Sequence, residues 1–497
     1  MNLTSDTLAI GVVGAGAMGS GIAQVAAATG RNVYLFDQRE GAAASARDKI
    51  LAQLDKRIAA GKASAEDRRI LETNILVARA IDDMKTCGLV VEAIIEDLAA
   101  KRDLFGQLAG LVAPDAVLAS NTSSLPIGAI AASVPHPQRV VGMHFFNPVP
   151  LMKLVEIIPS PETDEAVVTG LMELARQMGQ VPVQVRDTPG FLVNFGGRAY
   201  TTEALALVHE TVATPAQIDA VMRDCCGFRM GPFELMDLTG MDVNFPVTEF
   251  VHRSHFYDAR LRSTPLHRYL RETGRLGRKT GRGFFDYRGG SPAAQEEQQI
   301  SVAPADKIVV PGSTPELMRL VSEYQVEVLA HDDGASPILA APIGEDCSAL
   351  ASRLGLDHRR LVSLDLLANT DKRITIMSAP GADAAIRDRV TAMLAQKRSV
   401  TAIADSPGFI AQRICAMVAN LGCEMAQIGL AAPTDIDLAM RLGLNYPSGP
   451  LEMADAYGVK KMHTIMTQLH QLTGDDRYRP SQWLRRRAQL NLSALSA

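Results

Sequence analysis

Apolar and polar positions alternate along the first third of the chain in a rhythm typical of parallel α/β folds. Residues 8–13 form a short apolar run that predicts a buried strand. A helical stretch follows to about residue 28, and a second strand is predicted at 32–36. Later apolar runs predict further strands at 88–94, 116–120, 139–144 and 153–158. This order predicts a doubly wound, Rossmann-type sheet, in which ligands bind at the carboxyl ends of the strands.

A glycine-rich turn, GAGAMG, joins the first predicted strand to its helix. Gly14 suits the tight turn, Gly16 lets the backbone approach a pyrophosphate, and Gly19 allows close packing of helix against strand. Met18 belongs to the same candidate binding turn. A glycine-rich turn alone could bind nothing, but the flanking strands supply the context that the dinucleotide fingerprint requires.

The second predicted strand ends at an acidic residue, Asp37, at the distance from the glycine turn that the fingerprint requires. A carboxylate at this place accepts hydrogen bonds from the ribose hydroxyls of NAD and repels the 2′-phosphate of NADP. Arg39 lies close by and could instead receive that phosphate. The carboxylate at the strand end is the stronger of these two indications, so NAD is the expected cofactor.

From residue 187 onwards the pattern becomes helical, and it occurs twice. DTPGF at 187–191 matches DSPGF at 405–409, and GPFELMD at 231–237 matches GPLEMAD at 449–455, with the same shift in residue number for both motifs. A constant shift indicates a duplicated module. Gln412 stands where Asn194 stands in the first copy, so the second copy is expected to serve packing rather than chemistry.

The two copies are separated by segments of different character. The first is rich in Gly, Ser, Pro, Ala and Gln, which is typical of a linker, and the second resembles only the last part of a nucleotide-binding domain. The expected organisation is an NAD-binding Rossmann domain at 1–187, an all-α domain at 188–288, a linker at 289–315, a degenerate Rossmann-like fragment at 316–403 and a second all-α domain at 404–497.

Composition narrows the class of protein. The 50 basic and 55 acidic residues leave a formal charge of −5, which gives no support for a nucleic-acid partner. No stretch approaches the roughly 18 apolar residues of a membrane span, so no membrane partner is expected. Six scattered cysteines without metal-ligand spacing predict no metal site and a reduced, cytoplasmic protein.

Several motifs together resemble the (S)-3-hydroxyacyl-coenzyme A dehydrogenase family, in its long bacterial form. They are SNTSSL at 120–125, HFFNP at 144–148, KLVEI at 153–157, DTPGF at 187–191 and GPFE at 231–234. Their order and spacing fit the family across about residues 5–288. The resemblance implies NAD-dependent oxidation of the 3-hydroxyl of an acyl-CoA.

The same resemblance implies roles for four polar residues. His144 would be the general base and Glu156 the carboxylate that orients it, a pairing that suits proton transfer near neutral pH. Ser123 and Asn194 would hold the 3-oxygen or the thioester carbonyl of the substrate. Taken alone, a strand-end histidine, a serine near a helix start and an amide on a helix have structural explanations. The family usually has arginine after this asparagine, whereas Phe195 stands here.

Further cofactor positions follow only from the resemblance: Glu96, Lys101, Asn147 and Lys279. Lys279 lies in a basic, glycine-punctuated loop. A solvated turn is the alternative explanation, and a part in cofactor binding is favoured over it. The family's helical insertion maps onto residues 47–69, which is therefore the expected region for the coenzyme A phosphates. The Lys and Arg side chains there fit an ordinary solvated helix face equally well, so no single residue is assigned.

The long family members imply 3-hydroxyadipyl-CoA as the first expected substrate, as in aromatic (phenylacetate) catabolism, with 3-hydroxybutyryl-CoA next. A dicarboxylic acyl chain needs a cation near its far end, and Arg198 is a candidate. Shorter relatives dimerise through the helical domain, so either a homodimer or an intrachain pseudo-dimer of the two copies is expected. Two other classes stay open: a non-enzymatic NAD-binding protein and a dehydrogenase of free hydroxy acids.

Overall fold

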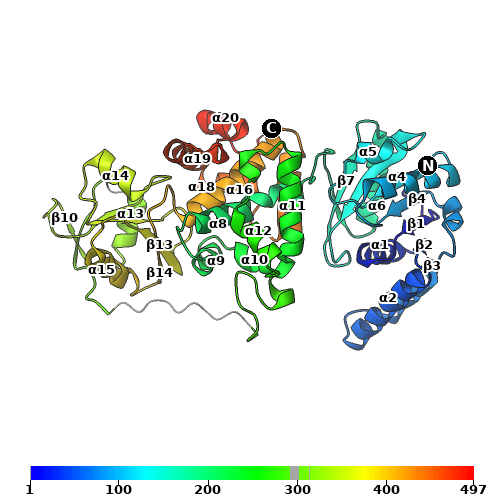
Figure 1. Ribbon diagram of the computed structural model, residues 1–497, viewed down its shortest axis with the longest axis horizontal. Coiled ribbons are helices and arrows are strands. Elements are labelled where there is room, and N and C mark those ends of the chain that lie inside the picture. The colour runs from blue at the N-terminus through cyan, green and yellow to red at the C-terminus, as the bar shows by residue number, and fades with distance from the viewer. Residues whose placement is uncertain (1, 291–300, 313, 497) are drawn as a thin grey trace. The chain divides into compact units, whose positions relative to one another are not determined.

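The structure is a computed structural model that describes residues 2–290, 301–312 and 314–496 (Figure 1). The chain forms two compact units, each with its own β-sheet. One contains Met1–Phe195 and Ile428–Leu444, and the other contains Gly196–Gln427 and Asn445–Ala497. Residues 291–300, the centre of the predicted linker, lie outside the described residues.

The first unit is built on an eight-stranded sheet within the described residues. Its strands are β1 (Ile10–Val13), β2 (Val33–Phe36), β3 (Ile75–Val77), β4 (Leu89–Glu92), β5 (Val117–Ser120), β6 (Val140–Phe145), β7 (Leu154–Pro159) and β8 (Val181–Gln184). The order is β3-β2-β1-β4-β5-β6-β7-β8, and β6 and β7 are the antiparallel pair in an otherwise parallel sheet. This arrangement confirms the predicted Rossmann-type domain.

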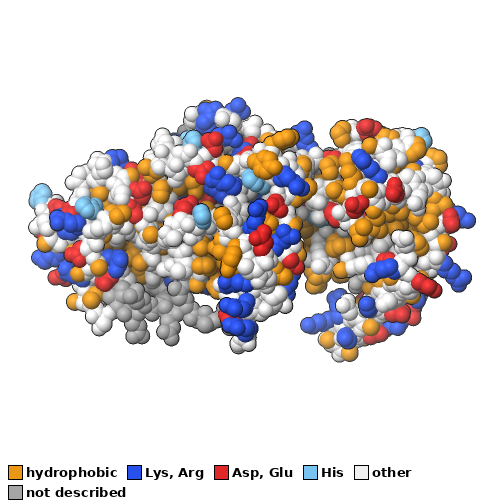
Figure 2. Space-filling model, in the orientation of Figure 1, with side chains coloured by type: hydrophobic (Ala, Val, Ile, Leu, Met, Phe, Trp, Pro, Cys, Tyr) orange, Lys and Arg blue, Asp and Glu red, His pale blue; other side chains and the backbone are white. Residues whose placement is uncertain are grey.

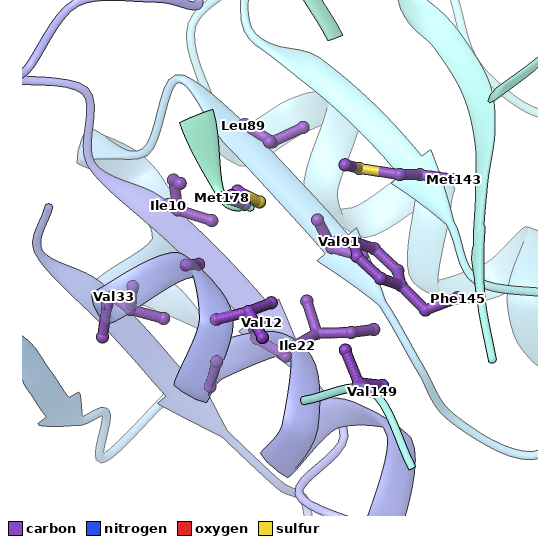
Figure 3. Close-up of a cluster of buried hydrophobic side chains, with 14 of the residues drawn as sticks. Ile10, Val12, Ile22, Val33, Leu89, Val91, Met143, Phe145, Val149 and Met178 are labelled. Carbon is purple, nitrogen blue, oxygen red and sulfur yellow. The ribbon is translucent and has the colours of Figure 1, made fainter. Parts of the chain in front are cut away.

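Helices cover both faces of this sheet because its central strands are apolar on both sides. They are α1 (Ala17–Ala27), α2 (Ala42–Ala59), α3 (Ala65–Asn74), α4 (Leu98–Leu111), α5 (Ile127–Ala131) and α6 (Glu165–Gln177), and the short α7 (Val193–Gly196) follows β8. Figure 3 shows the core where side chains of α1, β1, β4 and β6 meet, among them Ile22, Val12, Val91 and Phe145. The core fixes the ends of these strands, where the polar side chains of the site emerge.

A helix from the second helical copy completes the first unit. α17 (Pro433–Leu444) packs against β7 and β8. The segment leading into it is tied to the strand end: Arg186 N donates to Leu430 O at 2.8 Å, and an Arg186 guanidinium nitrogen donates to Ile428 O at 3.1 Å. The sequence predicts that the second copy serves packing, but it does not indicate that part of this copy packs on the first sheet.

The second unit contains a six-stranded sheet within the described residues, with strands β9 (Lys307–Val309), β10 (Glu327–Leu329), β11 (Ile338–Ala340), β12 (Leu361–Leu364), β13 (Arg373–Met377) and β14 (Ser399–Ile403). Their order is β10-β9-β11-β12-β13-β14, with β12 and β13 antiparallel, as β6 and β7 are in the first sheet. Its helices are α13 (Pro315–Val321), α14 (Cys347–Leu354) and α15 (Ala384–Leu394).

This sheet corrects one predicted boundary. β9 lies inside the segment expected to be linker, so the Rossmann-like region begins before residue 316. The β9–α13–β10 order also supplies a first parallel unit, whereas the sequence indicates only the last part of a nucleotide domain. The strands β9 and β10 are each three residues long, which is too short for them to stand out as apolar runs in the sequence.

The two helical copies pack together inside the second unit. They contribute α8 (Arg198–His209), α9 (Pro215–Asp224), α10 (Pro232–Thr239), α11 (Met241–Ser254) and α12 (Pro265–Glu272), and α16 (Ile410–Gln427), α18 (Pro450–Tyr457), α19 (Val459–Thr473) and α20 (Gln482–Leu490). The corresponding helices α8 and α16 lie against each other (Figure 1). The fully buried Arg413 of α16 joins them through Glu203 at 2.8 Å and Glu210 at 2.6 Å.

Each of the two helical copies contributes one helix that packs against the sheet of the other half of the chain. In the second unit α9, from the first helical copy, packs against β13. In the first unit its counterpart α17, from the second copy, packs against β7. Each sheet therefore carries a helix from the other repeat on its corresponding strand.

Candidate active site

The first part of the site is the glycine turn after β1. Gly14 has φ = 104°, and a Cβ there would lie 2.4 Å from Ala93 O. A Cβ on Gly19 would lie 1.7 Å from Gly14 O, so neither position accepts a side chain. At Gly16 a Cβ would meet none of the described atoms within 4 Å, which leaves the approach to the backbone open. Met18 is half-buried and packs against the hydrophobic core.

The geometry of this turn fits the diphosphate of NAD. Gly16 is the N-cap of α1, and no described side chain caps the helix, so its first N–H groups are left for an anion. Asp37 fixes the turn, since its carboxylate accepts from Ala15 N at 2.8 Å. Although burial acts to raise the pKa of Asp37, hydrogen bonds from Arg39 and Ala15 lower it, so the carboxylate stays charged to face ribose hydroxyls.

The second part is a buried histidine–carboxylate pair on the antiparallel strands β6 and β7. His144 and Glu156 are direct partners in the register, and the distance from Nδ1 to Oε2 is 2.7 Å. Both side chains are buried. With Nδ1–H donated to the carboxylate, the imidazole keeps Nε2 as its basic nitrogen. The rings of Phe146 and Phe191 flank the imidazole at 4.6 and 5.9 Å between centroids.

Backbone groups hold the carboxylate in place. Oε1 of Glu156 accepts from Leu192 N at 3.1 Å and from Val193 N at 2.9 Å, at the start of α7. These bonds compensate the burial of the charge. They also fix the segment that carries Asn194, whose side-chain amide donates to Ser123 O at 3.4 Å. The four predicted polar residues therefore belong to one connected arrangement.

Glu96 organises the loop that carries Ser123. Its Oε1 accepts from Thr122 Oγ1 at 2.6 Å, from Ser123 N at 2.9 Å, from Ser123 Oγ at 3.2 Å and from Ser124 Oγ at 3.0 Å. Burial acts to raise the pKa of Glu96, but these donors and the charge of Lys101 lower it. The carboxylate thus stays ionised and holds the hydroxyl of Ser123 near the carboxyl end of β5.

A residue that the sequence reading missed lies beneath this loop. Glu92 of β4 is fully buried and accepts from Lys101 Nζ at 2.6 Å and from Ser120 Oγ at 2.7 Å. Lys101 is 1 % exposed and also lies 3.4 Å from Glu96. Its ammonium therefore neutralises two carboxylates in this structure. The sequence did contain a sign of this pair: Glu92 stands inside an apolar strand, and a glutamate in such a place needs a buried partner, as Glu156 does.

A cleft of about 920 Å³ opens beside the glycine turn. Its wall combines α1, α2 and the segment 147–151, which begins with Asn147. Lys49, Lys56 and Arg57 of α2 line it, within the region expected to bind the coenzyme A phosphates. Asn147 therefore lies beside both the cofactor turn and this basic helix.

Lys279 belongs to the second unit. Its ammonium pairs with Asp242 at 2.8 Å, and its part in cofactor binding remains a prediction.

The second repeat carries a different set of groups. Gln412, in the place of Asn194, accepts from Gly344 N at 2.8 Å and donates to Pro342 O and Asp365 Oδ1 at 3.1 Å each. Asp365 pairs through its backbone with Thr375 on β13. Across the described residues of this sheet no histidine–glutamate pair occurs, and the glutamine amide is fully engaged in internal bonds.

Comparison with known proteins identifies the class. The sequence pattern of the 3-hydroxyacyl-CoA dehydrogenase NAD-binding domain matches residues 9–188, and that of the C-terminal domain of the same family matches twice, at 190–287 and 408–494. The chain belongs to the 3-hydroxyacyl-CoA dehydrogenase family. It is an NAD-dependent oxidoreductase, and the double match confirms the duplicated helical module.

Particular relatives cover either the whole chain or its first part. The 3-hydroxyadipyl-CoA dehydrogenase of Escherichia coli K12 is 39 % identical over 97 % of both chains. A crystal structure of an E. coli K12 3-hydroxybutyryl-CoA dehydrogenase has a TM-score of 0.87 at 37 % identity, covering 97 % of this chain and 98 % of that one. A probable 3-hydroxybutyryl-CoA dehydrogenase of Bacillus subtilis is 42 % identical over 56 % of this chain and 96 % of its own length.

Proposed function

We propose that the protein oxidises (S)-3-hydroxyadipyl-CoA to the 3-oxo thioester in aromatic (phenylacetate) catabolism. The 2.7 Å pair of His144 and Glu156 at the strand ends carries the reaction type. The full-length similarity to a relative named for 3-hydroxyadipyl-CoA supports the substrate. 3-Hydroxybutyryl-CoA is the second candidate, because other relatives are named for it.

Each residue of the arrangement has a defined task. Nε2 of His144 takes the proton of the 3-hydroxyl, and the charge of Glu156 stabilises the imidazolium that forms. NAD, when bound, supplies the hydride acceptor. Asn194 and Ser123 hold the 3-oxygen or the thioester carbonyl, and Glu96 keeps Ser123 in position.

The cleft along α2 is the proposed place for coenzyme A. Lys49, Lys56 and Arg57 offer three cations to its phosphates, and the apolar surface along the same cleft suits the rest of an acyl-CoA. The acyl-CoA substrate class follows from the family, whereas this assignment of the cleft is part of the proposal.

The test follows NADH absorbance when the protein is mixed with acetoacetyl-CoA. We expect consumption by the wild type and a loss on the order of 10²- to 10⁴-fold for His144→Ala, since the residue that returns the proton to the 3-oxygen in this direction is removed. NADH binding, measured by fluorescence, should survive. A His144→Ala variant with wild-type turnover would contradict the assignment. The ratio of kcat/KM for 3-hydroxyadipyl-CoA and 3-hydroxybutyryl-CoA then decides between the two substrates.

We further propose that the two helical copies form an intrachain pseudo-dimer. The packing of α8 on α16, and the reciprocal positions of α9 and α17, support this arrangement. The described part of the chain contains no helix that could cross a membrane. All six cysteines are buried thiols, which favours a reducing compartment, and we place the protein in the cytoplasm.

A further inference from the structure

Two carboxylates share one ammonium group at the carboxyl ends of β4 and β5. Lys101 Nζ lies 2.6 Å from a carboxylate oxygen of Glu92 and 3.4 Å from one of Glu96. Among the described residues, Lys101 is the cation within ion-pair distance of either carboxylate. Two negative charges and one positive charge leave one negative charge over in this Glu92–Lys101–Glu96 cluster.

The two carboxylates of the cluster differ in their surroundings. Glu92 is fully buried, and besides the bond from Lys101 it accepts from Ile94 N and from Ser120 Oγ, each at 2.7 Å. The side chain of Glu96 is 38 % exposed. The shorter, fully buried contact is the stronger ion pair, so the positive charge of Lys101 is compensated mainly by Glu92. The remaining negative charge therefore lies on Glu96, at the surface of the loop.

The other cations near the cofactor turn are of a different kind. Figure 2 shows side chains of both signs on the surface over α2. Lys49, Lys56 and Arg57 of this helix are exposed, and salt screens exposed charges over about 10 Å. Lys101 is 1 % exposed, so its charge acts on the two carboxylates with little screening. The charge of the cluster is therefore set mainly within the cluster.

The order of the strands places the cluster on the path of the cofactor. Asp37 stands at the end of β2, the glycine turn follows β1, and β4, β5 and β6 come next in the sheet. Asp37 suits the adenosine ribose and the turn suits the diphosphate. NAD must bring its nicotinamide ring to His144, the proposed base on β6. We infer that the nicotinamide half crosses the ends of β4 and β5, where Glu96 and Ser123 lie.

Oxidised and reduced cofactor differ in charge at this end of the molecule. The nicotinamide ring of NAD carries a positive charge, and the ring of NADH is neutral because it has taken up a hydride. The adenosine and the diphosphate are the same in both forms. A negative charge near the ring therefore stabilises bound NAD relative to bound NADH.

We propose that the Glu92–Lys101–Glu96 cluster sets the preference of the site for the oxidised cofactor. Glu96 presents the negative charge to the nicotinamide ring. Glu92 is a positioning residue, which acts through Lys101 and does not contact the cofactor. The preference for NAD favours release of NADH after each oxidation. The path of the cofactor rests on the proposed role of His144, whereas the acyl substrate does not enter this inference.

Cofactor binding to the full-length protein tests the proposal without turnover. The Kd of NADH is measured from its fluorescence and the Kd of NAD by competition, and the ratio of the first Kd to the second is compared between variants. Glu92→Gln removes a negative charge and should lower this ratio by about threefold or more. Lys101→Met removes the positive charge and should raise the ratio by about threefold or more. The double variant restores the net charge and should return the ratio to within about twofold of the wild type.

The opposite signs separate this role from a structural one. Each single variant leaves a buried charge without its partner, so both should lower Tm. A loosened loop would weaken the binding of both cofactors alike in both variants. Ratios that stay at the wild-type value, or that move in the same direction in the two single variants, would overturn the proposal.

Glu96→Gln tests the same charge without disturbing the buried ion pair. It should lower the ratio by about threefold or more, and a wild-type ratio in this variant would overturn the proposal. Glu173→Gln is the matched control, because it removes an exposed carboxylate from α6 of the same unit. Its ratio should equal that of the wild type, and a change as large as in Glu96→Gln would contradict a local effect. Wild-type turnover by His144→Ala would overturn the proposed base without altering these binding ratios.

Discussion

Buried charge decides most of the chemistry at the scale of single residues. Glu156, Glu92 and Asp37 are carboxylates in or at the end of strands, and each has a hydrogen-bonding partner that holds it in position. A buried carboxylate needs a polar partner, and this requirement explains the contacts of both Glu156 and Glu92. Only Glu156 contacts the proposed base, His144. The group that a buried charge contacts therefore indicates whether its role is functional or structural.

Lys101→Met tests the network beneath Ser123. Removing the cation leaves Glu92 buried without its ion partner, so unfolding free energy should fall by about 3 kcal/mol. The loop that Glu96 holds should loosen, and kcat should fall on the order of tenfold. Lys85→Met, at an exposed position, should change stability by no more than about 0.5 kcal/mol.

The pH dependence of this variant has a defined sign. Lys101 helps lower the pKa of Glu96 from its ordinary value of 4.5, so the associated stability is present above that pH and is lost as pH falls through the lowered pKa. The gap between wild type and Lys101→Met should therefore be wide at pH 7 and narrow below about pH 4.5. A gap that widens on acidification would contradict the assignment.

The sequence could predict that the candidate site residues come together, but it could predict their contacts only partly. His144, Glu156, Ser123 and Asn194 lie in motifs that keep their spacing, and strand-end geometry brings them together. The bonds of Glu156 to the backbone at the start of α7 could not be foreseen. They depend on how the chain turns after β8, which no local pattern records.

Periodicity predicted the first sheet better than the second at the scale of elements. The central strands of the first sheet are buried on both faces and stand out as apolar runs, whereas β9, β10 and β11 are three residues long. The packing of α17 against β7 and β8 could not be predicted from the sequence. Its partner strands end at Gln184, whereas the helix itself begins only at Pro433, and local patterns do not record contacts over such a separation.

Gly443→Leu tests the contact of α17 with the first sheet. A Cβ at Gly443 would already lie 3.0 Å from a methyl of Val193 and 3.1 Å from one of Leu154. Overpacking should cost about 1–3 kcal/mol and should lower kcat with acetoacetyl-CoA, since Val193 N–H holds Glu156. Gly110→Leu is the control, because a Cβ there meets no described atom within 4 Å. If both variants keep wild-type Tm and rate, α17 does not support the site.

Duplication has given the whole molecule two halves with unequal roles. The first carries the glycine turn and the His144–Glu156 pair, and the second has Gln412 and Asp365 locked in internal bonds. The second half nevertheless covers apolar surface of the first half, because α16 packs against α8 and α17 packs against β7. Among the described residues of the second sheet there is no counterpart of the His144–Glu156 pair, whereas the helices of the second copy pack against the first.

Truncation after Tyr287 tests the intrachain pseudo-dimer. The shortened chain lacks α16 and α17, so the apolar surfaces that these helices cover are exposed and should drive self-association. Light scattering should give a multiple of the chain mass or insoluble material for the truncated form, and a monomer for full-length protein. A soluble truncated chain in the same oligomeric state as the full-length protein would refute the pseudo-dimer.

The placement of α17 also has a consequence during protein synthesis. The last strand of the sheet that carries the site is complete once Gln184 has been added, but the helix that covers β7 and β8 is finished only at Leu444. An N-terminal domain usually folds while the ribosome is still elongating the chain. Here the surface of β7 and β8 that α17 covers stays exposed until most of the polypeptide has been made. We therefore expect chains that end before Pro433 to expose this surface and to aggregate more readily than the full-length protein.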